Sequence, residues 1–285
     1  PDFWRKLAPH FTIEGSAALH VLKFTKEQEK QLVAKMDKEA YVHLSQPGLK
    51  SSLQEMRDLL TVITDMNLPP VFAFAYDEFW TIHLQVRPLV KILLGADEFS
   101  MLPDFWAWRV KPGQSGWKPH RDKVSGCLFP NGKPKSITLW VPLSIAYPLN
   151  GCMYVLPADR DGIYYNDGEN GFKSTLPDMR ALPAQAGDVL AWTQRIFHWG
   201  SHSADNHDLP PRQSVAFEYQ RSDIPAFNSP LLDPDTIPDF KSRMALIGKQ
   251  VLQYTHMYEF TPDLVQMAQA IVKTFCLPAP TGKSE

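Results

Sequence analysis

His120 and Asp122 are separated by a single residue in the segment Trp117–Asp122. Residues i and i+2 of an extended chain point to the same side, so this spacing can present an imidazole and a carboxylate together. Such a pair is two thirds of a 2-His-1-carboxylate facial triad, which holds Fe(II) and leaves coordination positions open for oxygen chemistry. A lone His-x-Asp tripeptide is a weak signal, because His–Asp pairs also occur on protein surfaces by chance.

A second histidine that could complete this triad lies downstream of a predicted turn. Residues 186–188 have turn composition and precede the apolar strand Val189–Trp192, and a second strand is predicted to end at His198. A histidine at the end of such a strand can face the first two ligands. His202 and His207 compete with it, although both lie in a polar loop that favours solvated side chains.

Arg212 and Ser214 belong to an alternating segment, Pro211–Tyr219, that predicts a strand. The two side chains share one face of that strand by the same i, i+2 rule. An arginine that points into a barrel needs an anionic partner, and a carboxylate bound through both oxygens matches a guanidinium best. A dicarboxylate cosubstrate that chelates iron through its other end would supply this partner. An arginine at the barrel rim, paired with an Asp or Glu, is the alternative.

Around these residues the sequence predicts a β region between two helical regions. Short segments rich in Val, Ile, Trp, Phe and Thr, separated by Gly, Pro, Asn and Asp, run from Phe105 to about Tyr219 and predict a barrel or jelly roll. Strands are expected at Phe105–Val110, Ser136–Pro142, Cys152–Leu156, Asp188–Trp192 and Gln213–Tyr219. Helices are expected at about 25–38, 53–66, 78–94, 238–258 and 262–275.

Composition excludes several classes of function. The 285 residues carry a formal net charge of −2, so no basic excess is available to bind a nucleic-acid backbone. No apolar run is long enough to cross a membrane. The three cysteines are too few and too scattered for a disulfide framework, which favours a reducing, cytoplasmic location. The expected partner is a small-molecule substrate, and the oligomeric state cannot be derived from the sequence.

Taken together, His120-x-Asp122, His198 and Arg212 resemble the Fe(II)/2-oxoglutarate-dependent dioxygenases, and more narrowly the phytanoyl-CoA dioxygenase (PhyH-like) family. Leu149–Pro157 is similar to the family's strand that begins Asn-Gly-Cys. The spacing from Gly187-Asp188 to the distal histidine also matches the family. The resemblance covers roughly residues 76–220.

The resemblance implies a mainly β fold with flanking helices, built on a double-stranded β-helix of the jelly-roll or cupin-like type. We expect a single dioxygenase domain over residues 1–285, with the β core at about 100–222 and helical buttresses at 1–99 and 223–285. It further implies that His120, Asp122 and His198 are the catalytic residues and bind Fe(II).

By the same resemblance, the cosubstrate 2-oxoglutarate would chelate the iron and place its distal carboxylate on Arg212, with Ser214 as a further donor. Arg109 or Lys111 would assist that carboxylate. O2 would take the remaining position, and ascorbate is expected to support activity. The implied reaction hydroxylates or desaturates an unactivated C–H bond of a small metabolite, as in natural-product tailoring, and releases succinate and CO2.

Some features depart from the family pattern. Ala158–Arg160 replaces the usual Gly-Ser-His, and the stretch between His198 and Arg212 is longer than is common, which keeps His202 as a rival ligand. Asp122 stands where related halogenases carry Ala or Gly, which favours hydroxylation. The alternatives are an acyl-CoA hydroxylase, a cupin-like metal enzyme without oxygen chemistry, and a non-catalytic binding module.

Two groups of residues are expected near the pocket. The loop 161–173 is either a lid or an exposed insertion. Four tryptophans are candidates for the pocket wall or for ordinary core packing: Trp117, Trp140, Trp192 and Trp199.

Overall fold

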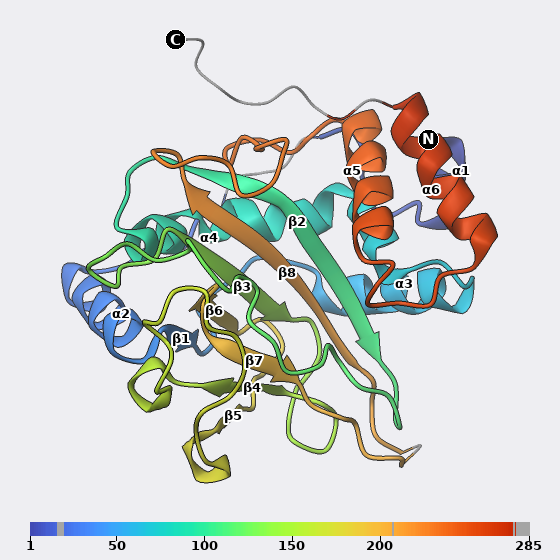
Figure 1. Ribbon diagram of the computed structural model, residues 1–285. Helices are drawn as coiled ribbons and strands as arrows, with labels where there is room; N and C mark the ends of the chain where they lie inside the picture. The colour runs from blue at the N-terminus through green and yellow to red at the C-terminus, as the bar shows by residue number, and fades with distance from the viewer. Residues whose placement is uncertain (16–19, 207, 276, 278–285) are drawn as a thin grey trace.

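The computed structural model describes residues 1–15, 20–206, 208–275 and 277. Two antiparallel sheets form its centre, with strand orders β1-β6-β3-β8-β2 and β5-β4-β7 (Figure 1). The strands are β1 (Tyr41–Leu44), β2 (Phe99–Val110), β3 (Ser136–Pro142), β4 (Met153–Leu156), β5 (Arg180–Leu182), β6 (Val189–Thr193), β7 (Phe197–Gly200) and β8 (Arg212–Arg221). This arrangement is the jelly roll that the sequence predicted.

The helices cover one face of the five-stranded sheet and its β2 edge (Figure 1). They are α1 (Asp2–Leu7), α2 (Lys26–Glu39), α3 (Leu53–Asp65), α4 (Asp77–Leu94), α5 (Phe240–Gln253) and α6 (Pro262–Thr274), with 3-10 turns at η1 (Pro70–Ala75), η2 (Ala158–Arg160) and η3 (Leu176–Asp178). Helix α2 begins with the predicted capping box of Thr25 and Gln28. No helix within the described ranges is long and apolar enough to cross a membrane.

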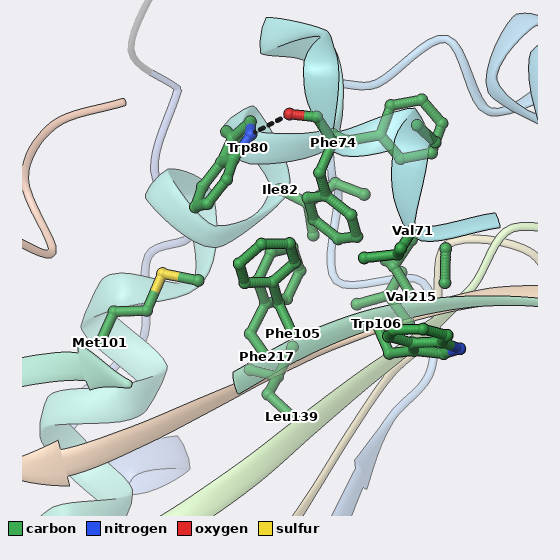
Figure 2. Packing of buried hydrophobic residues seen from close by; sticks show 14 of the residues in the cluster. Val71, Phe74, Trp80, Ile82, Met101, Phe105, Trp106, Leu139, Val215 and Phe217 are labelled. Atoms are coloured by element: carbon green, nitrogen blue, oxygen red, sulfur yellow. Dashed lines mark hydrogen bonds between the residues drawn. The ribbon is translucent and has the colours of Figure 1, made fainter. Parts of the chain in front are cut away.

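The main hydrophobic core lies between the large sheet and these helices. Leu139, Phe217 and Phe105 occupy neighbouring register positions on β3, β8 and β2, and they point toward the helices (Figure 2). Phe74 of η1 packs on them, with ring centroids 4.6 Å from Phe105 and 5.6 Å from Phe217. The indole N–H of Trp80 donates to the Phe74 carbonyl oxygen at 2.7 Å, so this buried donor is satisfied.

Strand alternation therefore sends the intervening residues to the opposite face of the sheet, toward the smaller sheet. On β3 these are Thr138 and Trp140, and on β8 they are Arg212, Ala216 and Glu218; all five line one cavity. The core packing thus decides which side chains of the same strands are free to carry function.

The structure corrects several sequence predictions of element boundaries. The short elements α1, β1 and β5 were not expected from the sequence. Strands of three or four residues, and a helix of six residues, are too short to show a clear hydrophobic periodicity. Strand β7 begins at Phe197, whereas the sequence predicted a strand ending there. Helix α5 ends at Gln253, and the turn that follows places Tyr254 in the cavity wall and Tyr258 within hydrogen-bond distance of Trp106.

Candidate metal centre and cosubstrate pocket

His120 and His198 lie next to each other on two backbone segments that are hydrogen-bonded to one another. The His120 N–H donates to the His198 carbonyl at 3.0 Å, and the His198 N–H donates back at 2.9 Å. Asp122 follows on the same side, with its Oδ1 3.3 Å from His120 Nε2 and 3.5 Å from His198 Nε2. The three potential ligand atoms all lie within 4.8 Å of one another.

Neighbouring groups orient each of these side chains. The Nδ1 of His120 lies 2.6 Å from the Lys118 carbonyl oxygen, and that of His198 lies 3.2 Å from the Ile196 carbonyl oxygen. Nδ1 is therefore the protonated nitrogen in each ring, and Nε2 is left with a free lone pair.

The carboxylate of Asp122 is fixed through its other oxygen. Thr138 donates its hydroxyl proton to Asp122 Oδ2 at 2.6 Å, and the indole N–H of Trp192 donates to the same atom at 3.3 Å. Because both donors occupy Oδ2, Oδ1 remains directed at the two imidazoles. The sequence analysis singled out these three candidate ligands but missed Thr138, whose inward position follows only from the alternation of β3.

Burial and mutual contacts shift the pKa values of all three side chains. Burial would raise the pKa of Asp122, but the nearby imidazoles of His198 and His120 and the Thr138 hydroxyl hold it well below its usual range. Burial lowers the pKa of His198 to about 4, so this imidazole is neutral at pH 7. For His120, burial opposes protonation, yet the carboxylate of Asp122 raises its pKa overall.

The donor set fits Fe(II). The Nε2 atom of His120 is buried and has no hydrogen-bond partner, an arrangement that a metal ion would satisfy. Two neutral imidazole nitrogens and one carboxylate oxygen form the facial triad of non-heme iron oxygenases. The rival ligand His202 is exposed, and its Nδ1 lies 2.8 Å from the Ser115 hydroxyl, away from this cluster. His207 lies outside the described residues.

Arg212 lies in the same cavity as the cluster. Its side chain is almost completely buried, with the residue only 1% exposed, and its Nη1 donates to the Ser214 hydroxyl at 2.8 Å. Trp140 lies beneath the guanidinium, 5.6 Å from ring centroid to Cζ. Within the described part of the chain no carboxylate pairs with Arg212, and burial lowers its pKa to about 10, so it stays charged at pH 7.

Two glycines make room for this arginine. A Cβ atom on Gly116 would lie 2.9 Å from Arg212 Nη2, and one on Gly200 would lie 3.1 Å from it. Any larger side chain at Gly116 would also meet the Gly200 backbone at 2.9 Å. The backbone thus approaches the guanidinium as closely as glycine permits.

Arg109 and Lys111 are placed elsewhere, contrary to the sequence-based expectation. Arg109 Nη1 donates to Thr64 Oγ1 at 2.9 Å and to Asp65 Oδ1 at 2.7 Å, so its charge is neutralised on helix α3. Lys111 Nζ lies 3.7 Å from the same Asp65 oxygen. Because neighbouring positions of β2 place Trp108 in the cavity, Arg109 must point to the outer face.

Aromatic side chains form a large part of the cavity wall. Of the four candidate tryptophans, Trp117, Trp140 and Trp192 line it, whereas Trp199 stacks on Tyr154 at 5.3 Å and does not. The wall also contains residues that the sequence analysis did not single out: Asp104, Thr138, Met153, Glu218 and Tyr254. Tyr254 is far from the other wall residues in sequence, and no local pattern reveals such a contact.

The loop 161–173 is held against the metal-binding segment. The buried guanidinium of Arg195 donates to the carbonyls of Ile163, Tyr164 and Asn166. Arg121, which stands between His120 and Asp122 in the sequence, forms an ion pair with buried Asp161, with 2.8 Å between Nη2 and Oδ2. These contacts fix the first half of the loop in place, which favours a fixed insertion over a lid.

Comparison with known families identifies the chain. The model of the phytanoyl-CoA dioxygenase (PhyH) family matches residues 24–208. The chain belongs to the phytanoyl-CoA dioxygenase family. A member of this family is an oxidoreductase of the 2-oxoglutarate-dependent class, whose cofactors are non-heme iron and 2-oxoglutarate, and the His-Asp-His cluster has the side chains that could hold such a metal. A search of curated protein sequences gave no match.

Solved structures share the fold of this PhyH-family chain. The apo form of the non-heme monooxygenase ThoJ aligns with a TM-score of 0.56 and 14% identity, over 80% of this chain and 100% of that one. The carbocyclase SnoK from nogalamycin biosynthesis has a TM-score of 0.53 and 16% identity, over 73% of this chain and 88% of SnoK. HygX from Streptomyces hygroscopicus, solved with nickel and 2-oxoglutarate, has a TM-score of 0.51 and 16% identity, over 70% of this chain and 88% of HygX.

Proposed function

We propose that this protein hydroxylates or desaturates an unactivated C–H bond of a small metabolite, with Fe(II) held by His120, Asp122 and His198. When bound, iron and 2-oxoglutarate supply the oxidising equivalent from O2, and the cosubstrate is converted to succinate and CO2. Arg212 would bind the distal carboxylate of 2-oxoglutarate, and Ser214 would orient the guanidinium. HygX, a structural relative, was solved with this cosubstrate, which supports the assignment.

The buried, unpaired charge of Arg212 is the observation that carries this proposal. Burying a guanidinium without a carboxylate is strongly unfavourable, so the site is complementary to an anion that arrives from outside the chain. The cavity that Arg212 shares with the metal cluster limits where this anion can lie. A dicarboxylate that reaches both the metal and the guanidinium satisfies the two requirements together.

The other residues of the cavity orient the reactants and exclude water. Trp108, Trp140 and Trp192 give the wall an apolar surface next to the three ligands. Asp122 occupies its ligand position through Oδ1 because Thr138 and Trp192 hold Oδ2. The structural relative SnoK belongs to a natural-product pathway, which supports a small metabolite as the substrate.

The proposal is tested by cosubstrate turnover and by binding. Metal-free protein is supplied with Fe(II), ascorbate and 2-oxoglutarate in air, and succinate is quantified with and without candidate substrates. We expect succinate from the unaltered protein and none from His120→Ala. In Arg212→Met, the 2-oxoglutarate concentration for half-maximal binding should rise by roughly a hundredfold, because a charge-assisted bidentate contact is lost.

Binding measurements distinguish a missing substrate from a wrong assignment. Without O2, the Fe(II)-loaded protein should bind 2-oxoglutarate even when no candidate substrate is turned over. Arg5→Met, which removes an exposed arginine, serves as the matched control and should bind normally. If the Fe(II)-loaded protein binds no 2-oxoglutarate, or if Arg212→Met binds it as well as the control does, the proposal is wrong.

A further inference from the structure

The inner face of strand β8 carries opposite charges at its two ends. Arg212 and Glu218 point into the same cavity from positions six residues apart, which corresponds to about 20 Å of strand. Thr138, the residue that binds Asp122, is the direct register partner of Glu218 on β3. The metal cluster therefore lies near the acidic end, and the cosubstrate anion is expected at the basic end.

Among the described residues no cationic side chain forms an ion pair with Glu218, and Lys123 acts on it only at longer range. Glu218 accepts a hydrogen bond from the Gln194 amide, and the oxygen of that amide is itself buried without a partner. The nearest candidate cation, Lys123, places its Nζ over the Phe227 ring at 5.0 Å. Burial and the nearby carboxylates of Asp104 and Asp122 raise the pKa of Glu218, as expected for a carboxyl group without a counter-ion, and a cation bound beside it would lower this pKa and favour the carboxylate.

Asp104, the second carboxylate at this end, is held only by neutral amides. Asn228 Nδ2 donates to its two oxygens at 2.9 and 2.8 Å, and Gln253 Nε2 donates to Oδ1 at 2.5 Å. These contacts fix the carboxylate, and the ammonium group of Lys249, 3.0 Å from Asn228 Oδ1 and from Gln253 Oε1, is the cation near it. Glu218 is therefore the carboxyl group at this end that lacks an ion pair. Asp104 and Glu218 border both the deep cavity and the pocket that adjoins it, which we call the opening and which Arg121 and Lys123 also line.

The aromatic wall beside these carboxylates offers ring faces and few hydrogen-bond donors. The indole N–H groups of Trp106 and Trp117 both donate to the Tyr258 hydroxyl, at 2.9 and 3.1 Å. The Trp117 and Tyr254 rings lie 4.9 Å apart and border the deep cavity and the opening. Because their N–H donors are occupied, Trp106 and Trp117 cannot donate to an anionic or neutral acceptor on a substrate, and they present π surfaces that attract cations.

We propose that the substrate of this protein carries a cationic nitrogen, a protonated amine or a quaternary ammonium group, seated between the Glu218 carboxylate and the rings of Trp117 and Tyr254. This inference rests on the proposed function, because it assigns the part of the cavity that the cosubstrate does not fill. Carboxylates and ring faces are the two groups that stabilise a partly dehydrated organic cation. An anionic substrate, such as a thioester of coenzyme A with its phosphates, would be repelled at the same place.

The test compares choline with its neutral isostere 3,3-dimethylbutan-1-ol, in which carbon replaces the charged nitrogen. Protein loaded with Fe(II) and 2-oxoglutarate is titrated with each probe by calorimetry in the absence of O2. We expect choline to bind at least about tenfold more tightly. In Glu218→Gln, which keeps the shape of the side chain, this preference should fall to within about threefold, while the affinity for 2-oxoglutarate stays unchanged.

Two further variants keep the test independent of folding. Glu259→Gln removes the same charge from an exposed residue in the segment between helices α5 and α6 and should retain the full preference for choline. Tyr254→Leu removes a ring face and should weaken choline binding more than binding of the isostere. If 2-oxoglutarate binds normally and choline shows no preference or no binding, the inference is wrong and the proposed function stands. If 2-oxoglutarate does not bind, the proposed function itself fails.

Discussion

Thr138 and Trp192 lie directly opposite each other on strands β3 and β6, and both donate a hydrogen bond to the same oxygen of Asp122. The cross-strand register thus places two donors from different strands on one carboxylate. Neither residue is near Asp122 in sequence. The sheet itself, through its register, sets which oxygen of Asp122 is available to a metal ion.

Thr138→Val should weaken metal binding while leaving the fold intact. Valine matches threonine in shape but removes the shorter of the two hydrogen bonds to Asp122, so the carboxylate can rotate. Loss of such a supporting contact typically reduces metal affinity by about ten- to a hundredfold. Anaerobic titration of the metal-free protein with Fe(II) measures this change.

Thr81→Val, on helix α4, is the matched control because it removes a hydroxyl that bonds only to its own helix. The control should bind Fe(II) as the unaltered protein does. Equal affinity in Thr138→Val and Thr81→Val would show that Asp122 does not depend on Thr138.

Gly116→Ala should impair cosubstrate binding selectively. The added methyl group would lie 2.9 Å from Arg212 Nη2 and 2.9 Å from the Gly200 Cα, so the guanidinium or the backbone must move. We expect the 2-oxoglutarate concentration for half-maximal binding to rise roughly tenfold, because the bidentate contact depends on the placement of Arg212.

Gly162→Ala provides a matched control, since a Cβ there would meet its nearest neighbour at an ordinary 3.5 Å. Fe(II) affinity should be unchanged in both variants, because neither position supports a ligand. A Gly116→Ala protein with normal cosubstrate affinity would contradict the assigned role of Arg212.

The sequence was most informative where function depends on local geometry. The His-x-Asp spacing and the alternation around Arg212 directly predict which side chains share a face, and the structure places these residues in one cavity. The same alternation argues against Arg109, because an inward Trp108 requires an outward Arg109. The expectation that Arg109 assists the cosubstrate came from the family resemblance, and the alternation of strand β2 was not used to decide which face Arg109 occupies.

Contacts between distant segments could not be predicted from the sequence. Tyr258 receives hydrogen bonds from Trp106 and Trp117 although it follows a helix near the end of the chain. Arg195 is charged and almost fully buried because backbone carbonyls of the loop 161–173 surround it, and nothing in its neighbourhood in sequence indicates this. Such residues depend on tertiary packing, which overrides local propensity.

Arg243→Met should destabilise the protein strongly. Arg243 Nη1 lies 2.5 Å from Asp77 Oδ1, both residues are buried, and the pair joins helices α4 and α5 to the N-terminal segment. Removing the arginine leaves a buried carboxylate without a cation, which typically costs about 3–5 kcal/mol.

Urea denaturation measures the free energy of unfolding. Arg5→Met, which breaks an exposed pair, should change it by less than about 1 kcal/mol, and a similarly small change in Arg243→Met would contradict this account.

His83 should make the protein less stable in acid. Burial lowers its pKa to about 4 in the folded state, below the ordinary histidine value of 6.5, while Arg87 and Asp235 act in opposite directions. The folded state therefore disfavours the protonated imidazole. Stability that is complete above pH 6.5 is lost as the pH falls toward 4, by about 3 kcal/mol in total for this group.

In His83→Leu, the free energy of unfolding should depend less on pH across this window, whereas His10→Leu, at an exposed position, should keep the slope of the unaltered protein. Parallel pH profiles for the unaltered protein and His83→Leu would show that His83 does not contribute to the acid sensitivity.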